Sequence, residues 1–110
     1  IQLNPNYGDA YFYRAWSYDE LGQDQNSMND LTKAIQLDPN DSAYYNNRGL
    51  SYGNLNQYQT AVADFTKAIQ LDPDGASAYD NRSIAYQAVG QYTLANADKT
   101  MACSLDSQYC

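Results

Sequence analysis

The sequence predicts an all-α fold, built as an array of antiparallel helix pairs stacked on one another. Two observations lead to this fold class. The segment TKAIQLDP occurs at residues 32–39 and again at residues 66–73, and Pro5, Pro39 and Pro73 stand 34 residues apart. A fixed period of this length is typical of helical repeats. We therefore expect the tail of a preceding repeat at 1–5, three repeats at 6–39, 40–73 and 74–107, and a short C-terminal tail at 108–110.

The central repeat shows how each unit divides into two helices. Within residues 58–71, apolar residues recur at i, i+4, i+7 and i+8 from Ala61, which is the spacing of one helix face. Residues 42–55 show a similar face that starts at Tyr45. The unit ends in Asp-Pro, and proline both lacks an N–H and disfavours helix in the residue before it. Polar turn and N-cap residues follow, so a new helix begins there.

These residues resemble the tetratricopeptide repeat, whose pattern runs from an aromatic residue through Leu-Gly, Tyr, Ala and Phe to a final Pro. The matching residues of the central repeat are Tyr45, Gly49, Tyr52, Ala61, Phe65 and Pro73. Arg48 replaces the usual Leu. In the third repeat Lys99 replaces the Phe, which favours a terminal repeat with a polar outer face and a closing helix at 92–105. The resemblance implies a right-handed superhelical solenoid.

Arginine and aspartate recur with the same period, and each Asp follows an Arg after 16 residues. The Arg stands where the family places a core Leu, so its guanidinium should reach across the helix pair to the Asp on the second helix. We predict three ion pairs, Arg14 with Asp30, Arg48 with Asp64 and Arg82 with Asp98. An anion-binding ladder of arginines is the alternative.

The composition argues against catalysis. The chain contains no histidine, which is the commonest general base and a frequent metal ligand. It has no Gly-rich phosphate-binding motif, and its acidic segments lack the full calcium-loop pattern. A formal net charge of -7 argues against nucleic acid as a partner. We predict a protein that is not an enzyme and holds no metal or cofactor.

The family resemblance implies that the first helix of each repeat lines a concave groove that binds a peptide or protein segment. The candidate groove residues are Phe12, Trp16, Asn46, Asn47, Leu50, Asp80, Asn81 and Ile84. Phe12 and Trp16 are the best anchors, because large aromatic residues carry much of the energy of interfaces. Packing against a preceding repeat or an adjoining helix is the alternative for both.

Some family members hold the C-terminal carboxylate of a chaperone with Lys, Asn and Arg. The corresponding positions here are Phe12, Trp16, Asn47, Ser77 and Asn81, of which only Asn47 fits. An acidic tail would face an acidic protein without those cations. We therefore expect an apolar, neutral or basic segment as the ligand.

Two further features leave the cellular compartment open between cytoplasmic and secreted. Cys103 and Cys110 are close enough in sequence to form a disulfide, although Cys103 also fits a small core position. Asn40 and Asn81 begin Asn-x-Ser patterns, which are N-glycosylation acceptors only in a secreted protein. The alternative to a groove binder is a structural subunit that stacks end to end into a filament.

Overall fold

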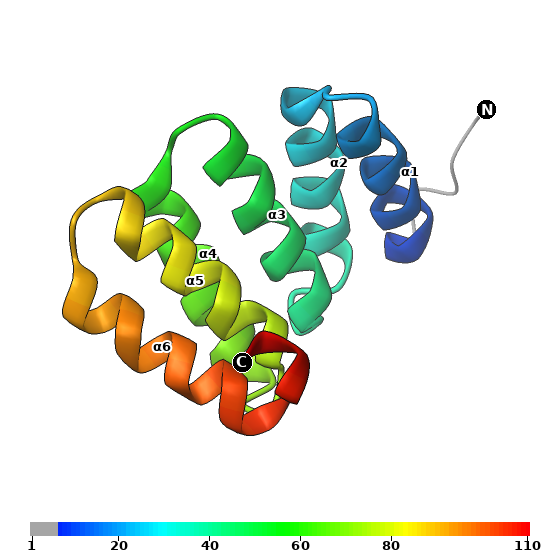
Figure 1. Ribbon diagram of the computed structural model, residues 1–110. Helices are drawn as coiled ribbons and strands as arrows, with labels where there is room; N and C mark the ends of the chain where they lie inside the picture. Colours follow the sequence, from blue (N-terminus) through cyan, green and yellow to red (C-terminus); the bar gives the residue numbers. More distant parts are fainter. Residues whose placement is uncertain (1–6) are drawn as a thin grey trace.

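The computed structural model describes residues 7–110, so the expected repeat tail at 1–5 lies outside the described range. This part of the chain is elongated, with extents of 44 × 25 × 21 Å, and its regular elements are all helical (Figure 1). The elements are α1 (Gly8–Glu20), α2 (Asp24–Leu37), α3 (Ser42–Asn54), α4 (Tyr58–Leu71), α5 (Ala76–Ala88), α6 (Tyr92–Leu105) and the 3₁₀ turn η1 (Ser107–Tyr109).

The helices form three hairpins that follow one another along the molecule (Figure 1). Within a hairpin, α1 packs on α2, α3 on α4 and α5 on α6, and the hairpins stack through α2 on α3 and α4 on α5. The predicted all-α repeat solenoid is confirmed. The helices expected at 58–71 and 92–105 have those bounds, whereas α3 ends at Asn54, one residue before the expected end. Each proposed repeat range holds one hairpin.

The turn inside each hairpin contains one residue with a left-handed backbone conformation, at the same position each time. These residues are Gly22 (φ 73°), Asn56 (φ 62°) and Gly90 (φ 80°). The N–H of the next residue donates back to the carbonyl five residues earlier, as from Gln57 to Tyr52 at 2.9 Å. Hydrogen bonds of this kind provide donors for the last carbonyl groups of the first helix. Glycine and asparagine are the residues that adopt this backbone conformation most readily, so the turn is set locally.

The core consists mainly of small residues. Alanines at 15, 34, 61, 68, 85, 95 and 102 are buried, together with the larger Leu31, Tyr44 and Phe65. Gly49 and Phe65 form the tightest fit, because a Cβ on residue 49 would lie 2.5 Å from the Phe65 ring. The absence of a side chain at residue 49 therefore lets α3 and α4 approach around the phenyl ring.

The expected polar outer face of the last hairpin is only partly present. Lys99 is exposed, as anticipated. However, α6 also exposes Leu94 and Met101, at positions where α4 has Thr60 and Lys67. The exposed surface of α6 is thus more apolar than that expected for the last helix of a repeat array.

Gly49→Ala should destabilise the protein by about 1–3 kcal/mol, because the added methyl group collides with the Phe65 ring. The matched control is Gly53→Ala, one turn later on α3, where a Cβ would meet nothing within 4 Å. That change should stabilise the protein by about 0.5–1 kcal/mol, because alanine is the better helix former. Urea unfolding of both variants measures the difference, and equal effects would contradict the proposed fit.

Candidate functional site

The three Arg–Asp pairs have one geometry. Arg48 donates from Nε to Asp64 Oδ2 at 2.8 Å and from Nη2 to Asp64 Oδ1 at 2.9 Å. The corresponding distances are 2.7 and 2.6 Å for Arg14 with Asp30, and 2.7 and 2.7 Å for Arg82 with Asp98. A planar guanidinium facing a carboxylate in this two-point manner fixes orientation as well as distance. Each pair therefore sets how the two helices of a hairpin lie against each other.

Two tyrosines flank each guanidinium. Arg48 Cζ lies 5.8 Å from the Tyr45 ring centre and 5.9 Å from that of Tyr52. Tyr11 and Tyr18 flank Arg14, and Tyr79 and Tyr86 flank Arg82, at similar distances. These separations are within the range of cation–π attraction.

Two of the arginines also contact a threonine of the preceding hairpin. Arg82 Nη1 donates to Thr66 Oγ1 at 3.1 Å, and Arg48 Nη1 lies 3.4 Å from Thr32 Oγ1. Each of these arginines thus links the second helix of one hairpin to both helices of the next. The sequence reasoning missed these threonines, although they also recur after 34 residues. The pKa of each arginine is raised, mainly by its hydrogen bonds to Asp.

The four apolar residues among the proposed groove residues fall into two groups. Trp16, Leu50 and Ile84, one from each first helix, are 57%, 37% and 57% exposed. We call these three residues the groove strip. Phe12 is instead half-buried, with its ring centre 5.4 Å from that of Tyr44 on α3. Phe12 therefore packs against an adjoining helix, which is the alternative expected for it.

Two depressions lie along the groove strip. One, of about 90 Å³, lies between α1 and α3 and is lined by Trp16, Asp19, Ser27, Leu31, Asn47 and Leu50. The other, of about 240 Å³, lies between α3 and α5, and its walls include Leu50, Gly53, Asn81 and Ile84. We call them the α1–α3 cavity and the α3–α5 cavity. Leu50 lines both cavities, so they adjoin each other along the first helices.

Polar residues beside the strip tie neighbouring first helices together. Asn46 Nδ2 donates to Ser77 Oγ at 2.8 Å, and Asn81 Nδ2 donates to Asn46 Oδ1 at 3.1 Å. Between α1 and α3, the Tyr44 hydroxyl donates to Asp9 Oδ1. Burial and this carboxylate raise the pKa of Tyr44. Asp80 is half-buried on α5.

Within residues 7–110, Asp9, Asp19 and Asp80 on the first helices form no ion pair with a Lys or Arg side chain. The chain has six cationic residues. The three arginines are paired as described above, and Lys33, Lys67 and Lys99 are exposed on the second helices. Asp19 instead has Asp24 as a neighbour, and Asn54 Nδ2 lies 3.4 Å from Asp19 Oδ1 and 3.1 Å from Asp24 Oδ1. Burial raises the pKa of Asp19, and so do a hydrogen bond with the Asp24 carboxyl group and the charge of that group.

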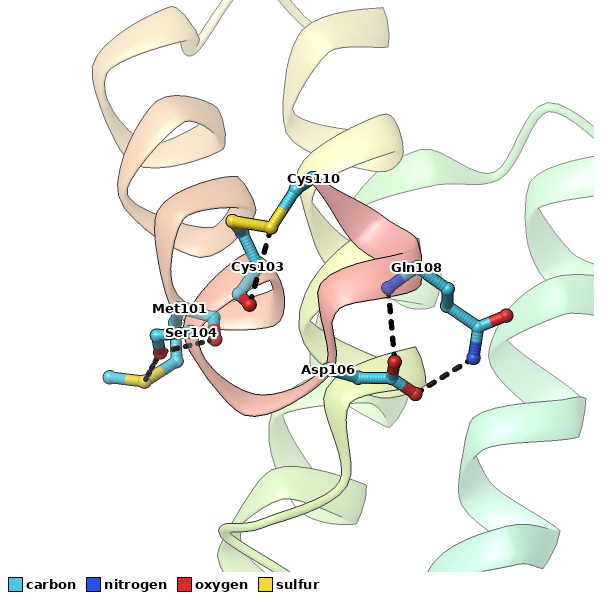
Figure 2. The surroundings of a disulfide bond; sticks show 6 residues. All are labelled: Met101, Cys103, Ser104, Asp106, Gln108 and Cys110. Carbon is cyan, nitrogen blue, oxygen red and sulfur yellow. Dashed lines mark hydrogen bonds between the residues drawn. A yellow bond between two sulfur atoms is a disulfide. The ribbon is translucent and has the colours of Figure 1, made fainter.

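The C-terminal tail folds back on α6, as Figure 2 shows, and a disulfide joins Cys103 to Cys110. Asp106 shapes this return, because its carboxylate accepts hydrogen bonds from the backbone N–H of Gln108 at 3.1 Å and from its side-chain Nε2 at 2.8 Å. These bonds hold the pKa of Asp106 below its usual value. The disulfide thus joins the last turn of α6 to the residue that follows η1.

The two Asn-x-Ser patterns differ in setting. Asn40 is exposed in the turn between α2 and α3, whereas Asn81 is half-buried within α5 and bonded to Asn46. The Asn40 side chain is thus the more accessible of the two.

Residues 7–110 contain no cluster of three or more His, Cys, Asp or Glu side chains suited to a metal ion. Within the same range, no helix is both long and apolar enough to cross a bilayer.

Comparison with models of known protein families identifies the repeat that forms these hairpins. The tetratricopeptide repeat family model matches the sequence at residues 8–41 and again at residues 42–74. The chain belongs to the tetratricopeptide repeat family. Its helix hairpins and 34-residue step are those expected of such a repeat. None of the curated protein sequences compared with the chain matches it.

Solved tetratricopeptide repeat structures superpose over nearly the whole chain. The Arabidopsis OM64 TPR domain is 28% identical, with 96% of this chain and 88% of that chain covered and a TM-score of 0.92. The TPR2B domain of yeast Sti1, in its pHsp70 complex, is 27% identical, with coverages of 92% and 81% and a TM-score of 0.89. The second TPR of Spaghetti (RPAP3), bound to the HSP90 peptide SRMEEVD, is 23% identical, with coverages of 94% and 95% and a TM-score of 0.90. At that identity the last likeness shows the fold alone.

Asp64→Ala should cost about 2–3 kcal/mol of unfolding free energy, because it leaves the half-buried Arg48 without its partner. Asp30→Ala should cost about 1 kcal/mol, since the side chain of its partner Arg14 is 41% exposed, against 19% for Arg48. Asp74→Ala, in an exposed turn, is the control and should be nearly neutral. Thermal and urea unfolding test this order. If Asp30→Ala were as costly as Asp64→Ala, burial would not be what sets the strength of the pairs.

Proposed function

We propose that this protein is a non-enzymatic interaction module whose groove strip binds an extended segment of a partner protein. The observation that carries this proposal is the exposure of Trp16, Leu50 and Ile84 in one column across α1, α3 and α5, beside two depressions. Large exposed apolar residues arranged contiguously mark interaction surfaces. Each side chain lies on a helix, so the surface is largely preformed and little ordering cost is added on binding.

The related structures support a peptide ligand. Yeast Sti1 TPR2B and the Spaghetti domain are described as complexes with pHsp70 and with an HSP90 peptide. The peptide SRMEEVD carries an acidic C-terminal half. In this chain Trp16, Asn47 and Asn81 line the two depressions, and no Lys or Arg among residues 7–110 lines either of them. We infer that the mode of binding is shared but that the ligand is a different kind of segment.

A selection from phage-displayed random twelve-residue peptides tests this function. We expect enriched peptides whose affinity falls at least about tenfold in Gly53→Leu, because the new side chain fills the α3–α5 cavity without meeting other atoms at its Cβ. Trp16→Ala should weaken binding similarly, since the exposed indole contributes little to folding. Thr60→Ala, on the exposed face of α4, is the control and should have no effect.

Either of two results would overturn the proposal. The selection could yield no enrichment, or the enriched peptides could bind Gly53→Leu and Trp16→Ala as well as they bind the unaltered protein.

End-to-end or lateral self-assembly is the second candidate function. The observation in its favour is the exposed apolar stripe of α6, which includes Leu94, Met101 and Leu105. Light scattering across a concentration series distinguishes it from the groove proposal. A concentration-dependent oligomer that Leu94→Lys dissociates would support assembly, and a monomer at all concentrations would exclude it.

A further inference from the structure

We propose that the segment bound in the groove is basic and apolar, with a Lys or Arg side chain in the α1–α3 cavity and an aliphatic or aromatic side chain in the α3–α5 cavity. This inference rests on the proposed function, because it assigns the chemistry of the ligand to the same groove. It is the opposite of the acidic peptide seen with one of the related structures.

The α1–α3 cavity combines the features that a basic side chain requires. Trp16 contributes an exposed indole and Asp19 a carboxylate to the same depression, with Leu50 as an apolar wall. A Lys or Arg stem packs along apolar surface while its charged head reaches a polar group. The indole face attracts a cation, and the carboxylate accepts its hydrogen bonds. The volume of this cavity, about 90 Å³, is on the scale of a single side chain.

The electrostatics at this cavity also call for a cation. Asp19 and Asp24 share a bridging donor that carries no charge, the side-chain amide of Asn54. The raised pKa of Asp19 reflects burial and the neighbouring negative charge. Because the folded pKa of this acid is raised, the folded state loses stability as pH rises from the unfolded pKa to the folded pKa of Asp19, so neutralising Asp19 should not impair folding. A ligand cation would supply the counter-charge that no Lys or Arg of this chain provides.

The α3–α5 cavity has a different character. Leu50 and Ile84 form its sides, Phe65 and Ala85 lie at its base, and Gly53 contributes no side chain. Its volume of about 240 Å³ suits a leucine-sized or aromatic side chain. Burying such a group contributes about 1.5–3 kcal/mol in favour of binding. In this proposal the α1–α3 cavity binds a charged side chain and the α3–α5 cavity binds an apolar side chain of the same segment.

An acidic segment fits this surface poorly. Asp9, Asp19 and Asp80 all lie on the first helices, and the three lysines lie on the second helices. A carboxylate entering the groove would meet like charge with no donor of opposite sign. Charge complementarity thus selects a basic partner among the segments that could fill the apolar cavity.

The peptides obtained in the display selection test the inference. We expect Lys and Arg to be at least about threefold more frequent in the enriched pool than in the starting library, with Asp and Glu depleted. Peptide affinity should fall as salt rises from about 50 to about 300 mM, because exposed charges are then screened. Synthetic versions of one enriched peptide provide the quantitative measurement by fluorescence anisotropy.

A double-mutant cycle locates the cation. Asp19→Asn should lower the affinity of a Lys-containing peptide about tenfold, which is the loss expected for one charge-assisted hydrogen bond. The same change should have little effect on that peptide after its Lys is replaced by Gln. Asp74→Asn, a charge-matched control in an exposed turn, should leave both affinities unchanged. Equal effects of the two protein variants would show that only net charge matters and would overturn the assignment to this cavity.

The outcomes separate this inference from the proposed function. Enriched peptides that are acidic or uncharged, yet lose affinity in Gly53→Leu, would retain the groove as the binding site and overturn the basic ligand. Basic peptides that are insensitive to Gly53→Leu and Trp16→Ala would show binding elsewhere and overturn both. A selection without enrichment would do the same.

Discussion

The two-point pairing of each Arg with the Asp 16 residues later is the interaction on which the array depends. The buried core is composed largely of alanines, which bury little apolar surface and interlock weakly. Such helices could slide or rotate against one another at small cost. A guanidinium held by a carboxylate, two tyrosine rings and a threonine of the preceding hairpin has one low-energy position. The pairs contribute orientation more than net stability, because burying two charges is itself costly.

This use of arginine also decides the character of the surface. All three arginines serve the hairpins, and the lysines lie on the second helices, so the first helices present carboxylates, amides and exposed apolar side chains. Because each arginine is paired with an aspartate of the second helix, its guanidinium is not free to neutralise the carboxylates of the first helices. The proposed basic and apolar ligand rests on this arrangement of charge. The second TPR of Spaghetti (RPAP3), which has a similar fold, is instead described as bound to the HSP90 peptide SRMEEVD.

The likeness to solved structures therefore has a clear limit. Backbone superposition extends over nearly the whole chain, with a TM-score of 0.92 for the Arabidopsis OM64 domain. A shared fold positions the first helices, but ligand chemistry resides in the side chains they present. Here Trp16 and Asp19 line one cavity, and Gly53 lines another without contributing a side chain. Under the proposed function, these three residues specify the ligand.

The sequence by itself determined the helices, the turns and the hairpin order, because those features depend on contacts between residues close in the chain. The 34-residue period, the Asp-Pro stops and the Gly or Asn turn residues act locally and recur, as do the Arg and Asp positions. Only the tertiary structure decided which groove candidates remain available. Phe12 and Trp16 are one helical turn apart and looked equivalent, yet Phe12 packs on Tyr44 and Trp16 stays exposed. That difference arises from the placement of α3 against α1, and residues in separate repeats meet only when the hairpins stack.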